Sequence, residues 1–242
     1  MKKLIAATFA VLLFAACAKE TKDGNLEISG NVEGLHKGTL FLKKFKDTAL
    51  VTIDSISIDG DSKFVTYVNI DEPEALYLFL DRGKTNSIDN SLMFFAEPGK
   101  MKIDTKLETF YANAKVTGSE NQKLYDDFKK VRSRFVNQQM DITKRVFEES
   151  MKTKTAGIPE NDPEFQSVIK RKYLYVVNFA LNNKDKEIAP FVALTEIPDA
   201  TVKYLELIEK GMTPKIAKSK YGKLLTEYVA ERKKAEDTVA AQ

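Results

Sequence analysis

The chain has 242 residues, with 38 Lys and Arg against 35 Asp and Glu. This near-neutral balance excludes nucleic acid as an expected partner, because proteins that bind it present a concentrated basic surface. A single cysteine, Cys17, and a single histidine, His36, leave no pair for a disulfide, no Cys-x-x-Cys redox motif and no histidine-based zinc site. Phosphate-binding glycine motifs, Walker loops and HExxH are absent as well. The sequence therefore predicts no metal, no cofactor and no enzyme activity.

The first 16 residues have the pattern of a secretory signal peptide. Lys2 and Lys3 precede an apolar run over 4–13, which Phe14-Ala15-Ala16-Cys17 follows. The run is too short to cross a bilayer, which needs about 20 apolar residues. The last four of these residues resemble the lipobox of bacterial lipoproteins. That resemblance implies that diacylglycerol is attached to Cys17, that the leader is removed, and that the new amino terminus receives an acyl chain such as palmitate. The alternative is an ordinary secreted protein with a cysteine at its cleavage site.

Removal of residues 1–16 leaves 36 basic and 35 acidic residues, so attachment to a membrane would come from lipid and not from charge. Residues 17–25 are polar and nearly free of apolar side chains, which predicts a flexible tether between lipid and domain. We therefore expect a lipid-anchored protein of the cell envelope, on the outer membrane. The periplasmic and surface faces both stay open.

Residues 26–118 alternate between apolar and polar side chains with the period of a half-buried β-strand. Leu26, Ile28 and Val32, for example, share one face of the first segment. Asp59-Gly60 and Pro98-Gly99 have the composition of tight turns. Further strands are expected at 39–45, 50–58, 63–70, 75–80, 91–97, 100–104 and 109–117. About eight short strands with turns between them predict an antiparallel β-sandwich domain.

At Ser119 the apolar period changes to that of a helix. Ser119-x-x-Gln122 has the form of a capping box, in which two side chains cap each other's backbone N–H groups. Ala156–Pro159 interrupts the pattern, and Asp162-Pro163 starts a second helix with an N-cap and a proline at the first position. Shorter helices are expected at 187–196, 199–210 and 219–237, with Gly211 as a C-terminal cap. Residues 119–242 are thus predicted as an α-helical domain of antiparallel hairpins, and the chain as an α+β multidomain protein.

Several short motifs run through the β half in a fixed order. Gly30-Asn31-Val32 comes first, Phe95–Gly99 lies near the middle, and Val116–Ser119 with Asn121 comes last. In order and spacing they resemble a domain of unassigned function found in envelope lipoproteins of certain Gram-negative bacteria, over Leu26–Tyr125. In many relatives that domain precedes a helical linker and a thioredoxin-like domain. The redox domain would begin at about residue 235, where this sequence ends, so the resemblance implies no redox centre here.

Three functions are compatible with these features. The first is a non-catalytic anchored module that binds an envelope partner, a protein or a glycan; the absence of tryptophan disfavours the glycan. The second is an accessory of envelope thiol-redox proteins without its own redox centre. The third is a hydrolase that uses carboxylates from the cleft between sandwich and helices. The protein-binding module is the preferred hypothesis, because the catalytic inventory is nearly empty.

The junction of sandwich and helices is the expected binding surface, because two architectures in one chain create a concave boundary. The side chains proposed to contact a partner there flank the Pro98-Gly99 bend or lie off the apolar stripe of the first helix: Lys100, Lys102, Tyr125, Arg132 and Arg134. Reversing the charge of both arginines is expected to abolish binding without lowering stability. The alternative is that each of these residues is simply solvated.

Three Asp-Ser or Asp-Thr pairs precede a small or apolar residue and resemble the O-glycosylation acceptor of these bacteria. The predicted acceptors are Thr48, Ser55 and Thr238. Thr48 in a turn and Thr238 in a loose tail are expected to be accessible. Ser55 lies inside a predicted strand, where Asp54-Ser55 could instead be a buried hydrogen-bonded pair.

Overall fold

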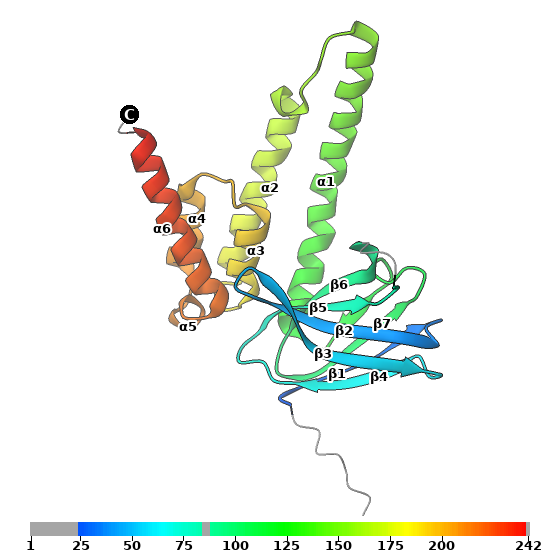
Figure 1. The fold of residues 1–242 in the computed structure, drawn as a ribbon. Coiled ribbons are helices and arrows are strands. Elements are labelled where there is room, and N and C mark those ends of the chain that lie inside the picture. The colour runs from blue at the N-terminus through cyan, green and yellow to red at the C-terminus, as the bar shows by residue number, and fades with distance from the viewer. Residues whose placement is uncertain (1–23, 84–87, 241–242) are drawn as a thin grey trace, which may run out of the picture.

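The computed structural model describes residues 24–83 and 88–240. The predicted signal peptide, Cys17 and residues 17–23 of the predicted tether lie outside them. The described part contains eight strands in two sheets, followed by helices (Figure 1). This confirms the predicted order of a β-sandwich and a helical unit.

The sandwich consists of two four-stranded sheets that do not close into a barrel. In strand order, the first sheet contains β4 (Lys63–Val68), β1 (Leu26–Glu33), β7 (Gly99–Lys106) and β8 (Lys115–Thr117). The second contains β3 (Ala49–Asp59), β2 (Lys37–Lys46), β5 (Glu74–Leu80) and β6 (Ser91–Ala96). The β1–β7 pair is parallel, which differs from the fully antiparallel sandwich predicted, while the other pairs are antiparallel.

Alternate residues of these strands fill one core between the two sheets. Leu26 and Ile28 of β1 face Leu40 and Leu42 of β2, and Phe94 of β6 is fully buried among them. Strand periodicity places every second side chain on this inner face, which is why the period-two pattern of the sequence located the strands well.

The predicted strand at 109–117 is wrong over most of its length. Only Lys115–Thr117 forms β8, and residues 109–113 are turns. Phe110 is buried there, and the Thr105 hydroxyl donates to its carbonyl oxygen at 2.7 Å. Ala112, which a strand would place on the same face as Phe110, is exposed. The turns bury Phe110 in the sandwich core, and Ala114 and Val116 pack against the same core.

The predicted tether also ends earlier than expected. The Asn25 side chain accepts from the Ile70 N–H at 3.0 Å and donates to the Ile70 carbonyl at 2.7 Å. A Cβ at Gly24 would lie 2.7 Å from the backbone nitrogen of Val68, so the chain passes very close to β4. Residues 24 and 25 therefore belong to the sandwich.

The helical part begins with a long hairpin, and further helices follow it. The hairpin consists of α1 (Glu120–Thr153), the short η2 (Pro159–Asn161) and α2 (Pro163–Asn182). The others are α3 (Ile188–Glu196), α4 (Val202–Gly211), α5 (Pro214–Ala217) and α6 (Lys220–Ala240); a short turn, η1 (Ile88–Asn90), precedes β6. In residues 24–83 and 88–240, no helix is long and apolar enough to span a bilayer.

The predicted helix caps are confirmed in part. Ser119 caps α1 by accepting from the Gln122 N–H, and Asp162 caps α2 by accepting from the N–H groups of Glu164 and Phe165. Gln122 does not complete the capping box, because its side chain binds the sandwich instead. Gly211 is the last residue of α4 and not its cap, which is Met212.

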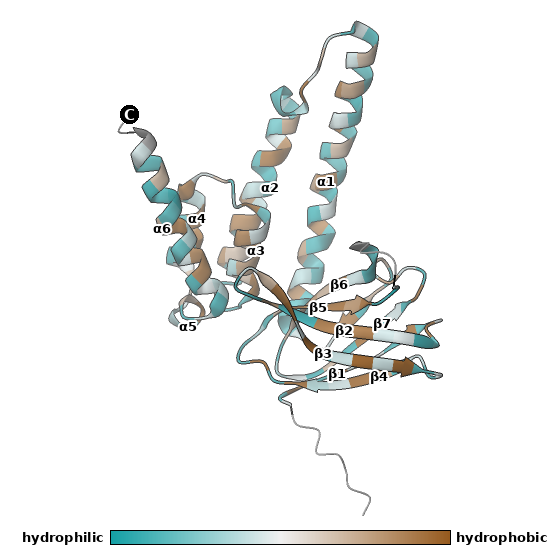
Figure 2. Ribbon diagram, in the orientation of Figure 1, coloured by the Kyte–Doolittle hydropathy of each residue, from teal (hydrophilic) through white to brown (hydrophobic). Residues whose placement is uncertain are grey.

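Two apolar clusters hold the helices. The larger one contains residues of α1, α2, α3, α4 and α6, together with Ala75 and Phe95 from the sandwich. A small separate cluster, Ile142, Val146 and Val168 with Phe135 and Phe165, lies along α1 and α2 only. Figure 2 shows α3 as largely hydrophobic and α1 as mostly hydrophilic, which fits a central α3 and a projecting hairpin. The helical core therefore includes part of the sheet.

Candidate functional site

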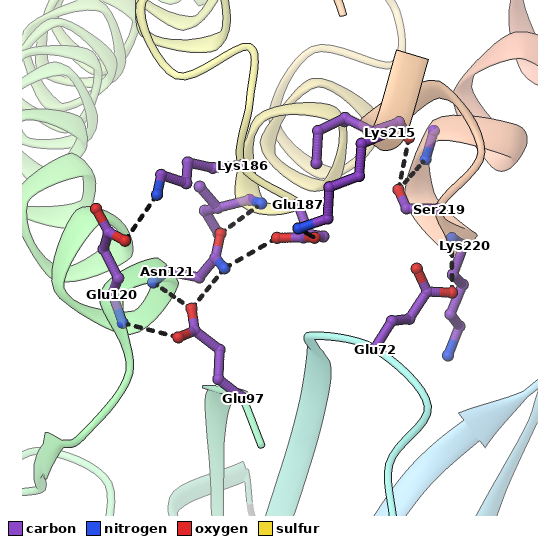
Figure 3. Close-up of polar contacts among 12 residues, drawn as sticks. Glu72, Glu97, Glu120, Asn121, Lys186, Glu187, Lys215, Ser219 and Lys220 are labelled. Atoms are coloured by element: carbon purple, nitrogen blue, oxygen red, sulfur yellow. Dashed lines mark hydrogen bonds and ion pairs between the residues drawn. The ribbon is translucent and has the colours of Figure 1, made fainter. Parts of the chain in front are cut away.

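A polar seam ties the start of α1 to the sandwich and to α3 (Figure 3). The Glu97 carboxylate accepts from the N–H groups of Glu120 (3.1 Å) and Asn121 (2.7 Å), an arrangement that the positive end of a helix favours. The buried Asn121 side chain donates to Glu97 and Glu187 and accepts from the Ile188 N–H at 2.9 Å. One asparagine thus connects the sheet, α1 and α3.

Two helical side chains also satisfy backbone groups of the second sheet. Gln122 accepts from the Phe95 N–H at 2.7 Å, and the Tyr221 hydroxyl accepts from the Ala75 N–H at 2.9 Å. Ala75 and Phe95 are paired in the sheet. The helices therefore complete the hydrogen bonding of β5 and β6 at this end, and burial holds the pKa of Tyr221 above its usual range.

Glu72 and Glu74, at the start of β5, are engaged in structural contacts. Glu72 accepts from the Lys220 N–H at 2.9 Å, at the first residue of α6. The Glu74 carboxylate, whose side chain is 6% exposed, lies between the ammonium groups of Lys44 (3.1 Å) and Lys220 (2.6 Å). In the part of the chain that the structure describes, no group of three acidic, histidine or cysteine residues could hold a metal ion.

A groove of about 730 Å³ opens where the β2–β3 hairpin, β5, α3 and α6 meet. Its apolar lining includes Phe45 and Leu224, each 43% exposed, and the ring of Tyr77. The groove is bordered by Thr48, Thr195, Lys223 and Glu227. We call this the junction groove. A second hollow of about 430 Å³, which includes the Glu74 ion pairs, adjoins it at Phe45, Asp47 and Lys220.

The aromatic rings of the junction groove continue into the helical core. Phe45 packs edge-on against Tyr77 at 5.5 Å between ring centroids, and Phe191 packs against Tyr221 at 5.0 Å. Phe191 also contacts Phe95, which is fully buried. Burial raises the pKa of Tyr77. The groove therefore has a floor of aromatic rings packed against one another.

Tyr125 and Arg132 are not the free contact residues that the sequence predicted. Tyr125 is buried, and its ring lies edge-on to Phe191 at 6.0 Å. Arg132 pairs with the nearly buried carboxylate of Glu196 at 2.8 Å. Arg134 is exposed, as expected.

Lys100 and Lys102 lie on β7, in the sheet that does not form the junction groove. They are exposed, and they pair with Glu27 (3.5 Å) and Asp104 (2.6 Å) respectively. The structure therefore does not bring the five predicted contact residues together, although the groove does lie at the predicted junction.

The predicted glycosylation sites within the described residues are all exposed. Thr48 lies in the β2–β3 turn and lines the junction groove. Ser55 is exposed on β3, while Asp54 accepts from the Thr66 hydroxyl, so the idea of a buried Asp54-Ser55 pair is wrong for Ser55. Thr238 lies in α6 and donates to the Lys234 carbonyl at 2.7 Å, so the loose tail predicted for it is wrong as well.

Sequence reasoning missed the groove residues Phe45, Tyr77, Phe191 and Leu224. A signal was present in the strands, since residues 40–42 and 75–80 are apolar at consecutive positions. Such runs indicate strands that are covered on both faces, as β5 is at its start, where the helices cover Ala75. Phe191 and Leu224 had no comparable signal. An apolar residue on a predicted helix is expected to lie in the core, so neither residue indicated a groove.

The sandwich and the first residues of α1 together match a known domain. Residues 26–125 match a Domain of unknown function (DUF4369). The match extends past the sandwich into α1. It therefore includes Asn121 and Gln122, which bond α1 to the sandwich, and Tyr125, which lies in one apolar cluster with Phe95. It confirms the domain of unassigned function that the sequence motifs indicated. No curated protein matches the chain.

Proposed function

We propose that this protein is a non-catalytic, lipid-anchored component of the cell envelope that binds a protein partner in the junction groove. The observation that carries the proposal is the groove itself, in which Phe45, Tyr77 and Leu224 are partly exposed beside the packed rings of Phe191 and Tyr221. Protein interfaces are enriched in aromatic residues at their centres and polar at their rims. The Thr, Lys and Glu side chains around this groove provide such a rim.

The chemistry of the chain supports binding over catalysis. His36 is exposed in the turn between β1 and β2, with no acidic or hydroxyl side chain bonded to it in the described residues. In the adjoining hollow, Glu72 caps α6 and Glu74 is held between two lysines, so these two carboxylates serve the structure. We expect the purified protein not to reduce the disulfides of insulin, and activity above that of Cys17→Ala would contradict this expectation.

The lipid anchor is supported by the leader and by the position of Cys17 close to the folded domain. Only seven residues separate Cys17 from Asn25, which is already bonded to the sandwich. Intact-mass measurement of the membrane-extracted protein is expected to show a lipid adduct that Cys17→Ala lacks. An unmodified wild-type chain that starts at Cys17 would overturn the anchor.

Photocrosslinking in intact cells tests the proposed binding site. A photoreactive phenylalanine analogue at position 224, in the groove, is expected to form a covalent adduct with a protein. Position 207 on α4 is the matched control, because Leu207 is similarly exposed (49%) but does not line the groove. Leu224→Arg should abolish co-purification of the captured protein, whereas Leu207→Arg should not. Equal adducts at both positions, or none at either, would refute the site.

A further inference from the structure

The outer side of the second sheet is divided into a covered and an uncovered half. At the covered end, Ala75 and Phe95 are packed under the helices. Beyond them, strand register places Phe41 beside Phe79 and Lys43 beside Tyr77. Their sequence neighbours Leu40, Leu42, Leu76 and Leu78 face the sandwich core, so these four side chains project outward. Figure 1 shows the helices over one end of the sheet only.

We call Phe41, Lys43, Phe45, Tyr77 and Phe79 the aromatic face. Its rings are packed together, with 6.4 Å between Tyr77 and Phe79 and 5.5 Å between Phe45 and Tyr77. Phe45 and Tyr77 also line the junction groove, so the aromatic face and the groove form one continuous surface. The aromatic face shares its aromatic side chains with the covered end of the sheet, where Phe95 is buried.

Lys43 is the charged group at the centre of the aromatic face. Its ammonium lies 4.6 Å from the ring centroid of Phe79 and 5.6 Å from that of Phe41. The neighbouring Lys44 and Lys220 both pair with Glu74, whereas within residues 24–83 and 88–240 no carboxylate pairs with Lys43. A cation on an aromatic surface, without a counter-ion, is complementary to an acidic group of a partner.

We propose that the aromatic face binds an amphipathic helix of the partner protein, with a carboxylate of that helix paired to Lys43. The apolar side chains of the helix cover the rings, and one end reaches Leu224 in the junction groove. A helix is inferred because the chain covers the equivalent end of this sheet with its own helices. This inference rests on the proposed function, since it names the chemistry of the partner at that site.

Selection from a phage-displayed library of helix-forming 20-residue peptides tests the proposal with the full chain as bait. The wild-type protein is expected to enrich peptides with an apolar stripe and a Glu or Asp at one fixed position. Lys43→Glu should enrich peptides with Lys or Arg at that position. It should also bind the wild-type peptides about tenfold more weakly or worse, the loss expected for one charge-assisted hydrogen bond. The fold should survive, because Lys43 contributes only ring contacts at the surface.

Lys63→Glu, an exposed lysine on the other sheet, is the matched control and should leave the selected peptides unchanged. The proposal is overturned if the wild type enriches no helical peptide, if the preferred charge does not reverse in Lys43→Glu, or if extended or neutral peptides are selected. In those cases a protein crosslinked at position 224 would still support the proposed function. Absence of that crosslink would remove the proposed function itself.

Discussion

At the scale of single residues, Asn121 connects three parts of the chain. Its side chain binds Glu97 at the end of β6, Glu187 before α3 and the backbone of Ile188. No apolar residue could replace it without leaving buried polar groups unpaired, which costs about 1–3 kcal/mol for each group. The sequence motif that included Asn121 was recognised, but its role required the fold, because Glu97 and Glu187 lie far away along the chain.

We therefore expect Asn121→Ala to lower the free energy of unfolding by about 2–4 kcal/mol. Asn113→Ala is the control, since the exposed Asn113 side chain donates to the Thr109 hydroxyl and its loss should cost less than about 1 kcal/mol. Urea unfolding at neutral pH measures both. Equal losses for the two variants would show that the seam contributes little to stability.

Ionisation of Tyr125, in the helical core, is expected to make the stability of the protein depend on pH. Burial, aided by the negative charge of Glu196, raises the pKa of Tyr125 to about 12 from its model-peptide value of 10.0. Below pH 10 the folded and unfolded chains both keep the proton, so stability does not change through this group. Between pH 10 and about 12 only the unfolded chain loses it, so stability falls as pH rises.

Tyr125→Phe is accordingly expected to lose less stability between pH 10 and 12 than the wild type does. Its stability at pH 7 and at pH 9 should differ from that of the wild type by the same amount. Denaturant unfolding at these pH values checks both statements. A slope identical to that of the wild type above pH 10 would show that Tyr125 ionises at its ordinary pKa.

At the scale of elements, one carboxylate joins three helices. Glu196 at the end of α3 pairs with Arg132 of α1 at 2.8 Å and with Lys172 of α2 at 3.3 Å. The Glu196 side chain is only 9% exposed, so removing its partners leaves a nearly buried charge. We therefore no longer expect reversal of the Arg132 charge to leave stability unchanged.

Arg132→Glu should destabilise the protein by about 1–3 kcal/mol, allowing for the partial exposure of Arg132 to solvent. Arg134→Glu, two residues away on the same helix, should change the free energy of unfolding by less than about 0.5 kcal/mol, because Arg134 is exposed. Thermal unfolding followed by circular dichroism compares the pair. If both variants behave alike, the Arg132–Glu196 contact is not a stabilising one.

Most elements could be predicted from the sequence, because strand and helix periods and the Ser119 and Asp162 caps are local signals. The residues of the junction groove could not. Phe45, Tyr77 and Leu224 meet only after a hairpin, a central strand and the last helix have packed together. The strand predicted at 109–117 failed over residues 109–113 for a related reason, since turns bury Phe110 there and only Lys115–Thr117 pairs as a strand.

At the scale of the whole molecule, sandwich and helices form one packed body. Adjacent residues of β6 show this directly, because Phe94 lies in the sandwich core and Phe95 in the helical core. A strand whose neighbouring side chains stabilise two cores couples their unfolding. We therefore expect the predicted boundary between residues 118 and 119 to mark a change of architecture and not a division between independent folding units.

Phe94→Ala and Phe95→Ala test this coupling as a matched pair. Each should cost about 3–5 kcal/mol, and each should lower the midpoint of one common transition. The decisive measurement is the far-ultraviolet signal of the helices in Phe94→Ala, whose substitution lies in the sandwich. A helical midpoint that does not move in that variant would show two independent domains.

The far half of the α1–α2 hairpin differs from the rest of the molecule in having a small apolar cluster of its own. Every residue of that cluster comes from α1 or α2, and α1 alone is about 50 Å long. Removing or adding seven residues, about two turns, in each helix would keep the two apolar stripes in phase. The span of the protein can therefore vary through matched insertions and deletions in this hairpin, while the groove and the seam keep their geometry.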